Sequence, residues 1–64
     1  MKINKTEFFN KLDKINLLDY KIDYKRNQNF FIYKGFKYVL ESIIIEDKNN
    51  KNYPIKDNYY KFKI

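Results

Sequence analysis

The sequence predicts an α+β protein in which one N-terminal amphipathic helix packs on a small antiparallel sheet of about four strands. Apolar residues recur at helical spacing near the N-terminus and at every second position in the later segments. Short polar segments separate these alternating stretches, as turns separate antiparallel strands. The chain has only 64 residues, so residues 1–64 are predicted to form a single domain.

The predicted helix covers about residues 5–16 and has a well-marked first turn. Asn4 is placed to cap it, and Glu7 follows three residues later, at the spacing of a capping box. An apolar stripe at positions i, i+1, i+4 and i+7 runs along one side of the helix. Its members are Phe8, Phe9, Leu12 and Ile15. This side is expected to lie on the sheet.

The strands are expected over residues 19–25, 30–33, 36–46 and 59–64. In the third strand the alternation slips between Val39 and Ile43, which predicts a β-bulge or a bend near residues 41–42. Residues 53–58 contain the single proline, which opposes central pairing, so they are predicted to be irregular. The last strand is expected at the sheet edge, with Lys61 and Lys63 on its outer face.

The best-defined turn is the two-residue loop at positions 34 and 35, where Gly35 supplies the positive φ that a tight hairpin needs. Four aromatic rings around this loop are expected to share one face. Their pairs are Tyr33 opposite Phe36 and Phe31 opposite Tyr38.

The alternation predicts two apolar faces, and one short helix can cover only one of them. Tyr20, Tyr24, Tyr60 and Phe62 are assigned to the face of the four rings. Phe30, Ile32 and Val39, with Ile43 and Ile45 beyond the bulge, are assigned to the other face. The sequence leaves open which face the helix covers. The uncovered face calls for a partner: a second copy, a heterologous protein, or a nucleic acid stacked on its rings.

The composition excludes several kinds of chemistry. There is no Cys and no His, so thiolate chemistry, the commonest general base and the usual zinc sites are missing. The single Gly rules out a Gly-rich phosphate loop, and the acidic residues do not have the spacing of a calcium site. A non-catalytic protein is therefore predicted, with no catalytic residue, no cofactor and no metal.

The formal net charge of +6 attracts nucleic acid, anionic surfaces and acidic proteins. Lys, Asn, Ile, Tyr and Phe, which share A/T-rich codons, supply 44 of the 64 residues, so codon bias alone can account for many of the lysines. Five basic residues are predicted to cluster near one end of the first three strands, as a phosphate-contacting patch or as a solvated surface. They are Lys21, Lys25, Arg26, Lys34 and Lys37.

Residues 34–41, "KGFKYVLE", resemble a strand motif of RNA-recognition domains at five of its seven specified positions, with Lys37 and Glu41 as the departures. The resemblance implies that Phe36 and Tyr38 are exposed and stack on bases. The fold of that family also needs a strand before its first helix and a second helix later. Only the first four residues are available for that strand, and no segment predicts the second helix. The alternative is a hairpin whose rings face the core.

In size, positive charge and A/T-coded composition, the chain resembles the short inhibitor proteins of bacteriophages and other mobile elements, of which the anti-CRISPR proteins are the best known. The resemblance implies a small binding protein that docks on a host protein or a protein–RNA complex and blocks it sterically. Direct contact with the nucleic acid, and a homodimer, stay open. No apolar run is long enough for a signal peptide or a membrane span, so a cytoplasmic location in the host cell, without membrane contact, is expected.

The contact surface is expected at the hairpin loop and the basic cluster. The residues assigned to it are Tyr33, Lys34, Phe36, Lys37, Tyr38, Lys21, Lys25 and Arg26. The alternative function is a sequence-tolerant single-stranded RNA- or DNA-binding module that uses a basic, aromatic sheet face. A subunit of a larger assembly is the third class.

Overall fold

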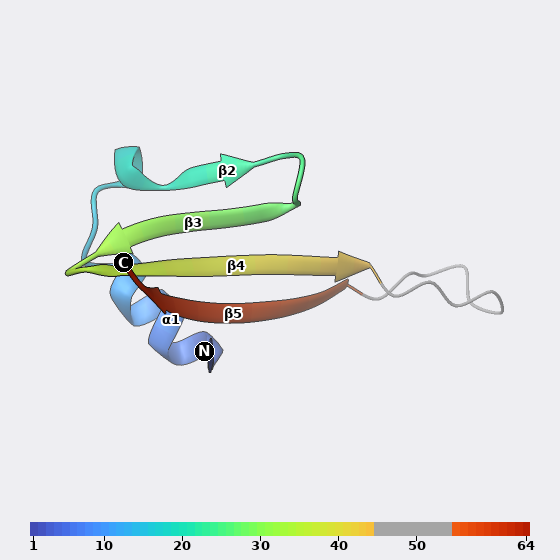
Figure 1. The fold of residues 1–64 in the computed structure, drawn as a ribbon, viewed down its shortest axis with the longest axis horizontal. Coiled ribbons are helices and arrows are strands. Elements are labelled where there is room, and N and C mark those ends of the chain that lie inside the picture. Colours follow the sequence, from blue (N-terminus) through green and yellow to red (C-terminus); the bar gives the residue numbers. More distant parts are fainter. Residues whose placement is uncertain (45–54) are drawn as a thin grey trace, which may run out of the picture.

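The computed structural model describes residues 1–44 and 55–64, in which one α-helix packs on a five-stranded antiparallel sheet (Figure 1). The predicted α+β class is confirmed, with one strand more than expected. In chain order the elements are β1 (Lys2–Ile3), α1 (Lys5–Leu12), a 3-10 helix (Leu17–Asp19), β2 (Lys21–Asp23), β3 (Gln28–Tyr33), β4 (Phe36–Ile44) and β5 (Ile55–Lys63). The strand order across the sheet is β1-β5-β4-β3-β2.

The strands β4 and β5 form the long central pair of the sheet. Each has nine residues, and they pair in one continuous antiparallel register from Phe36 opposite Lys63 to Ile44 opposite Ile55. The predicted bulge at residues 41–42 is therefore wrong. The alternation of apolar residues slips there because both faces of β4 carry them: Val39 and Ile43 point to one face, and Leu40 points to the other.

The short strand β1 pairs with Tyr59 and Tyr60 of β5, and the backbone N–H of Lys61 donates to the Met1 carbonyl at 2.8 Å. The expectation of an edge strand at residues 59–64 is thus wrong where β1 covers β5. Residues 55–58, predicted to be irregular, belong to β5, since each pairs with a residue of β4.

The helix α1 begins where the sequence predicts it. The Asn4 side-chain oxygen accepts a hydrogen bond from the backbone N–H of Glu7 at 2.7 Å, which caps the first turn. The helix ends at Leu12, four residues before the predicted end at Asn16. Asn16 instead caps the 3-10 helix, where its side-chain oxygen accepts from the Leu18 N–H at 3.1 Å. An asparagine side chain that bonds to the backbone in this way competes with helix continuation.

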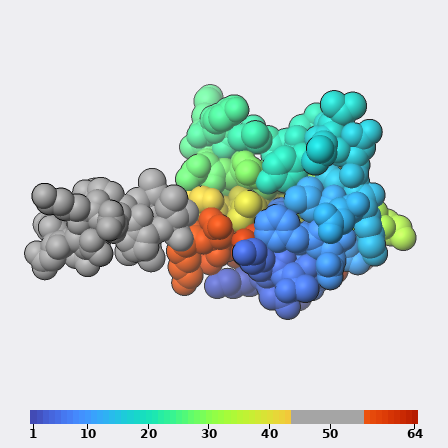
Figure 2. All heavy atoms as spheres, turned by 180° about the vertical axis from the view of Figure 1, so that it is seen from behind, coloured from blue at the N-terminus to red at the C-terminus, as the bar shows by residue number. Residues whose placement is uncertain are grey.

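The core is a cluster of aromatic rings between α1 and the sheet. Phe8 is fully buried, and its ring centroid lies 5.2 Å from the centroids of both Phe31 and Tyr59. Phe31 in turn stacks on Tyr38 at 5.0 Å, with the two planes only 10° apart. Leu12 and Ile15 pack against this cluster as predicted, whereas Phe9 lies at its border and is partly exposed. Figure 2 views the molecule from the side of α1 and shows the N-terminal residues, in blue, lying over the strands.

The hairpin between β3 and β4 has the predicted loop and register. Tyr33 pairs with Phe36 and Phe31 with Tyr38. Both loop residues have positive φ, 46° at Lys34 and 78° at Gly35, as a type I′ turn requires.

Other strand bounds differ from the predicted ones. The first predicted strand, at residues 19–25, is reduced to β2, because residues 17–19 form the 3-10 helix and residues 24–27 form a turn. The Asp23 side chain stabilises this turn by accepting from the backbone N–H groups of Lys25 and Arg26. Residues 45–54 lie outside the described residues. They include the end of the third predicted strand with Ile45, the predicted polar loop, and Pro54.

We expect Phe8→Ala to lower the free energy of unfolding by about 3 to 5 kcal/mol, because a fully buried ring leaves a cavity at the centre of the cluster. Phe9→Ala is the matched control on the same helix, and its cost is about 1 kcal/mol because its ring is 38% exposed. Urea unfolding followed by circular dichroism measures both values. Equal losses for the two variants would contradict this account of the core.

The hairpin loop gives a second prediction. Gly35→Ala is expected to lower the free energy of unfolding by about 1 to 2 kcal/mol through backbone strain. A Cβ at this position meets no atom within 4 Å, so a steric clash adds nothing. Lys34→Asn is expected to raise stability by up to about 1 kcal/mol, since Asn adopts positive φ more readily than Lys. The same urea titration tests both, and a stable Gly35→Ala variant would rule out the type I′ loop.

Candidate functional site

The helix α1 covers one face of the sheet (Figure 2), and among the described residues no second α-helix is available to cover the other face. Because successive side chains of a strand alternate, the contacts of Phe8 with Phe31 and Tyr59 send the residues next to them, Phe30 and Tyr60, to the opposite side. We call that side the open face. Its apolar side chains are Phe30, Ile32, Val39, Ile43, Tyr60 and Phe62, and its polar ones are Lys2, Lys21, Asp23, Gln28, Lys37, Glu41, Lys56 and Asn58.

The open face is organised in rows across the strands. One row runs through all five strands as Lys21, Phe30, Val39, Tyr60 and Lys2. Its middle is apolar and both its ends are lysines.

The next row, towards the hairpin loop, places Lys37 between Ile32 and Phe62. The row on the other side holds Asp23, Gln28, Glu41 and Asn58, which are acids and amides. The apolar centre therefore has lysines within it and at both sheet edges, whereas the acids and amides form a row on one side of it, away from the hairpin loop.

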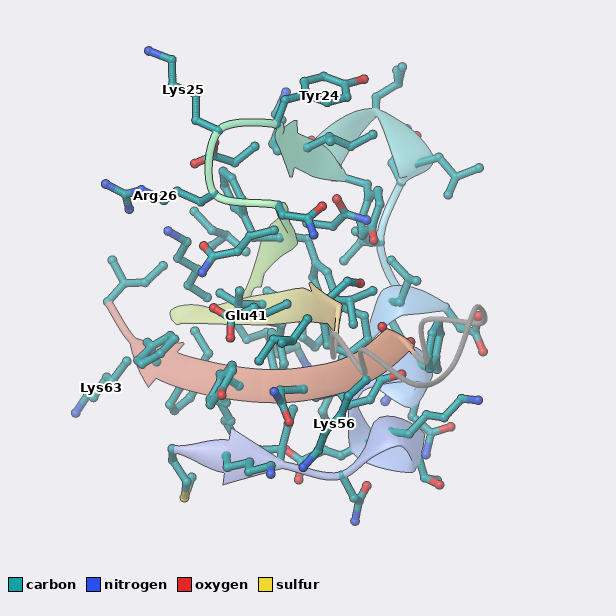
Figure 3. All side chains as sticks on the ribbon, turned by 90° about the vertical axis from the view of Figure 1, so that its right-hand side faces the viewer. Tyr24, Lys25, Arg26, Glu41, Lys56 and Lys63 are labelled. Atoms are coloured by element: carbon teal, nitrogen blue, oxygen red, sulfur yellow. The ribbon has the colours of Figure 1, made fainter. Side chains whose placement is uncertain are left out.

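Several apolar side chains of this face are exposed to solvent. Ile32 is 56% exposed, Phe62 47% and Ile43 41%, whereas Val39 beneath them is buried. A shallow hollow of roughly 320 Å³ on this face is lined by Arg26, Gln28, Lys37, Val39, Glu41, Tyr60 and Phe62. Figure 3 shows Arg26 and Glu41 on the side of the sheet away from α1.

The charges on the open face are unevenly satisfied. The Glu41 carboxylate accepts from Gln28 Nε2 at 3.0 Å, and Asp23 lies 3.9 Å from Arg26 in addition to its turn hydrogen bonds. Lys37 Nζ lies 4.5 Å from the centroid of the Phe30 ring, a cation–π contact. The two ion pairs within residues 1–44 and 55–64 include none of the open-face lysines. This face thus carries positive charge that no ion pair among the described residues neutralises.

The structure separates the eight residues that the sequence assigns to a contact surface. Tyr33, Phe36 and Tyr38 lie on the face covered by α1, and Tyr38 is 2% exposed. A ring buried in this way has no surface to offer a base or a protein partner, so the exposure that the RNA-recognition motif implies for Tyr38 is absent. Of the eight, Lys21 and Lys37 hold open-face positions on their strands, and Arg26, in the turn before β3, lines the hollow of that face.

The predicted basic cluster is also divided. Lys25 and Arg26 precede β3, whereas Lys34 follows it, so they lie at opposite ends of that strand. The Lys34 ammonium lies 5.4 Å from the Tyr33 ring centroid, at the hairpin loop. The expectation that the five basic residues gather near one end of the sheet is therefore wrong.

The sequence places Tyr60 and Phe62 on the wrong face and so misses two members of the open face. Their rings lie 6.1 Å apart and nearly parallel on β5. The residues that do face α1 from this strand are Tyr59 and Lys61. Because Tyr59 and Tyr60 are adjacent and chemically alike, alternation alone gives no signal for the choice between them.

Lys61 is the least expected residue on the covered side. Its ammonium lies 4.4 Å from the Phe36 ring centroid and 3.6 Å from the Glu7 carboxylate. The prediction that Lys61 lies on an outer face is wrong, because its aliphatic stem helps to cover aromatic rings of the core side. Nearby, burial raises the pKa of Tyr59 above its ordinary value of 10.0, with smaller contributions from Asp57 and Tyr20.

The described residues contain no group of three or more His, Cys, Asp and Glu side chains that could hold a metal ion. No helix among them has the length and apolar character needed to span a membrane. Comparisons with protein-family models, with curated proteins and with solved structures gave no match to this chain.

The open face can be altered without loss of the fold. Ile32→Ser and Phe62→Ser are each expected to change the free energy of unfolding by less than about 1 kcal/mol, because about half of each side chain is already in water. Val39→Ser, on the same face but 4% exposed, is expected to cost about 2 to 4 kcal/mol. Urea unfolding of the three variants tests this, and similar losses in all three would show that Ile32 and Phe62 belong to the core.

Proposed function

We propose that this protein is a small non-catalytic binding protein that docks through its open face on a heterologous protein. The matching surface of that partner is apolar at its centre and acidic around it. The observation that carries the proposal is the row of exposed apolar side chains, with Ile32 and Phe62 on either side of Lys37.

The arrangement fits the usual anatomy of a protein interface. Such interfaces have an apolar centre with aromatic anchors and a charged, solvent-accessible rim. Here Phe62 and Ile32 supply exposed apolar area, and Lys2 and Lys21 stand at the two sheet edges. Complementary acidic side chains on the partner would speed association and fix the orientation.

The charges argue against a second copy as the occupant of this face. Two copies stacked face to face would bring the central Lys37 of each, with the lysines around it, into one interface. Among the described residues the open face has two acids, Asp23 and Glu41, which cannot neutralise all four of its lysines, Lys2, Lys21, Lys37 and Lys56. Like charges facing one another across an interface are destabilising.

Protein docking is also favoured over base stacking. A stacking platform needs flat aromatic faces open to solvent. On this face the most exposed apolar side chain is the aliphatic Ile32, and the Phe30 ring has the Lys37 ammonium over it. Thirteen lysines against one arginine also suit an acidic protein surface better than bidentate phosphate contacts.

The finer form of the proposal is a steric inhibitor. It rests on the resemblance in size, charge and composition to the short inhibitor proteins of phages and mobile elements. In that role the open face would cover a functional surface of a host protein or of a protein–nucleic-acid complex, and the bound protein would block access to it.

The test compares Phe62→Ser, the double variant Ile32→Ser with Phe62→Ser, and the control Phe9→Ser in pull-downs from native host cells. Phe9 is exposed to a similar extent but lies on the helix side. The specific partner is expected to bind the wild type and the control, and to lose at least about tenfold in affinity with the double variant. Its capture should survive nuclease treatment, and crosslinks from the purified pair should map to Lys37 or Lys21.

A partner that binds the double variant as tightly as the wild type would overturn the assignment of the open face. Nuclease-sensitive capture, together with oligonucleotide binding that falls steeply with salt, would move the assignment to nucleic acid.

A further inference from the structure

The strand β2 forms one border of the sheet, and among the described residues it pairs only with β3. Its outer backbone groups are therefore free to pair with another strand. Exposed apolar side chains gather around this border: Leu17 is 78% exposed, Leu18 80% and Tyr24 86%, and Ile22 lies between them on the strand itself. This surface is separate from the open face.

We infer that β2 pairs antiparallel with β2 of a second copy of this chain, with Ile22 opposite Ile22 of the second copy. The inference goes beyond the proposed function and rests on none of its residues except Lys21 and Asp23 at the border of the open face.

The register supplies the charge complementarity that identifies the occupant. When Ile22 sits on the two-fold axis, Lys21 of each copy lies opposite Asp23 of the other, and both side chains point to the same side of the sheet. Each copy thus contributes one cation and one anion, and the pairing forms two opposite-charge pairs. An unrelated strand would need an acid and a base at the two matching positions to form the same pairs.

The flanks of β2 carry exposed apolar side chains that would face one another across the proposed axis. Figure 2 shows residues around 17–20 and around 24–27 as two projections with a dip between them. Antiparallel pairing brings the projection that carries Leu17 and Leu18 in one copy towards the projection that carries Tyr24 in the other. Exposed apolar side chains from both copies are then removed from water.

Lysine on a short edge strand ordinarily discourages pairing. Here Lys21 discourages pairing with a neutral or basic strand but not with this chain itself, since Asp23 stands opposite. The three-residue length of β2 limits the number of backbone hydrogen bonds, so a reversible monomer–dimer equilibrium is expected.

The pairing has a consequence for binding, which rests on the proposed function. A two-fold axis perpendicular to the sheet places the open faces of both copies on the same side. The dimer would then present a ten-strand surface to a partner, or two copies of the docking surface to a symmetric one.

Sedimentation velocity of the protein alone, over a concentration series, tests the inference. The wild type is expected to shift from monomer to dimer. Lys21→Asp places aspartates opposite one another twice, and is expected to weaken the dimer roughly tenfold or more. Adding Asp23→Asn to that variant removes the repulsion and is expected to restore part of the association. Asn keeps the side-chain oxygen that accepts from the Lys25 and Arg26 N–H groups, so the turn survives.

Lys2→Asp is the matched control, because it makes the same charge change on the opposite edge strand and should leave the dimer intact. A wild type that stays monomeric throughout, a Lys21→Asp variant that dimerises as well as the wild type, or a double variant no better than the single one would each overturn the inference. Loss of the dimer in the Ile32→Ser and Phe62→Ser variant would overturn it in favour of face-to-face stacking. No partner is present in these measurements, so they are independent of whether the open face binds one.

Discussion

The contact of Phe8 with the sheet decides how the rest of the molecule is used. Its buried ring touches Phe31 on β3 and Tyr59 on β5, and Phe31 stacks on Tyr38 of the strand between them. Because side chains alternate along a strand, a helix fixed on these rings assigns every other side chain of the three strands to a face. A register shift of one residue would exchange the two faces completely.

That assignment gives the same residue type opposite roles. Lys61 faces α1, where its ammonium lies over the Phe36 ring and pairs with the Glu7 carboxylate, so its charge is paired within the fold. Lys37 faces the other way and lies over Phe30, where no ion pair among the described residues holds its charge. The two lysines differ in these roles because their positions along β4 and β5 send their side chains to opposite faces.

Small size explains why so much apolar surface is left over. A chain of 64 residues buries only about 60% of the surface that its unfolded form exposes. One eight-residue helix is enough to cover one face of the central strands but neither the other face nor the edge at β2. The two surfaces differ in chemistry: the open face carries unbalanced lysines, whereas the β2 border carries one lysine and one aspartate on either side of an isoleucine. This difference is the reason for proposing an unlike partner for the first surface and a second copy for the second.

The sequence by itself determined the features that depend on neighbouring residues. The Asn4 cap, the loop at Gly35 and the pairing of Tyr33 with Phe36 are local, because a few dihedral angles and adjacent side chains decide them. That the protein is non-catalytic stays a prediction, which rests on the composition of the sequence.

Tertiary structure alone decided the rest. The two residues of β1, Lys2 and Ile3, become a strand only because β5, far away in the sequence, lies beside them. The open face depends in the same way on long-range packing. Tyr59 and Tyr60 are adjacent residues of the same type, so the sequence does not distinguish them. The contact with Phe8 places Tyr59 on the covered face, and Tyr60 therefore lies on the open face.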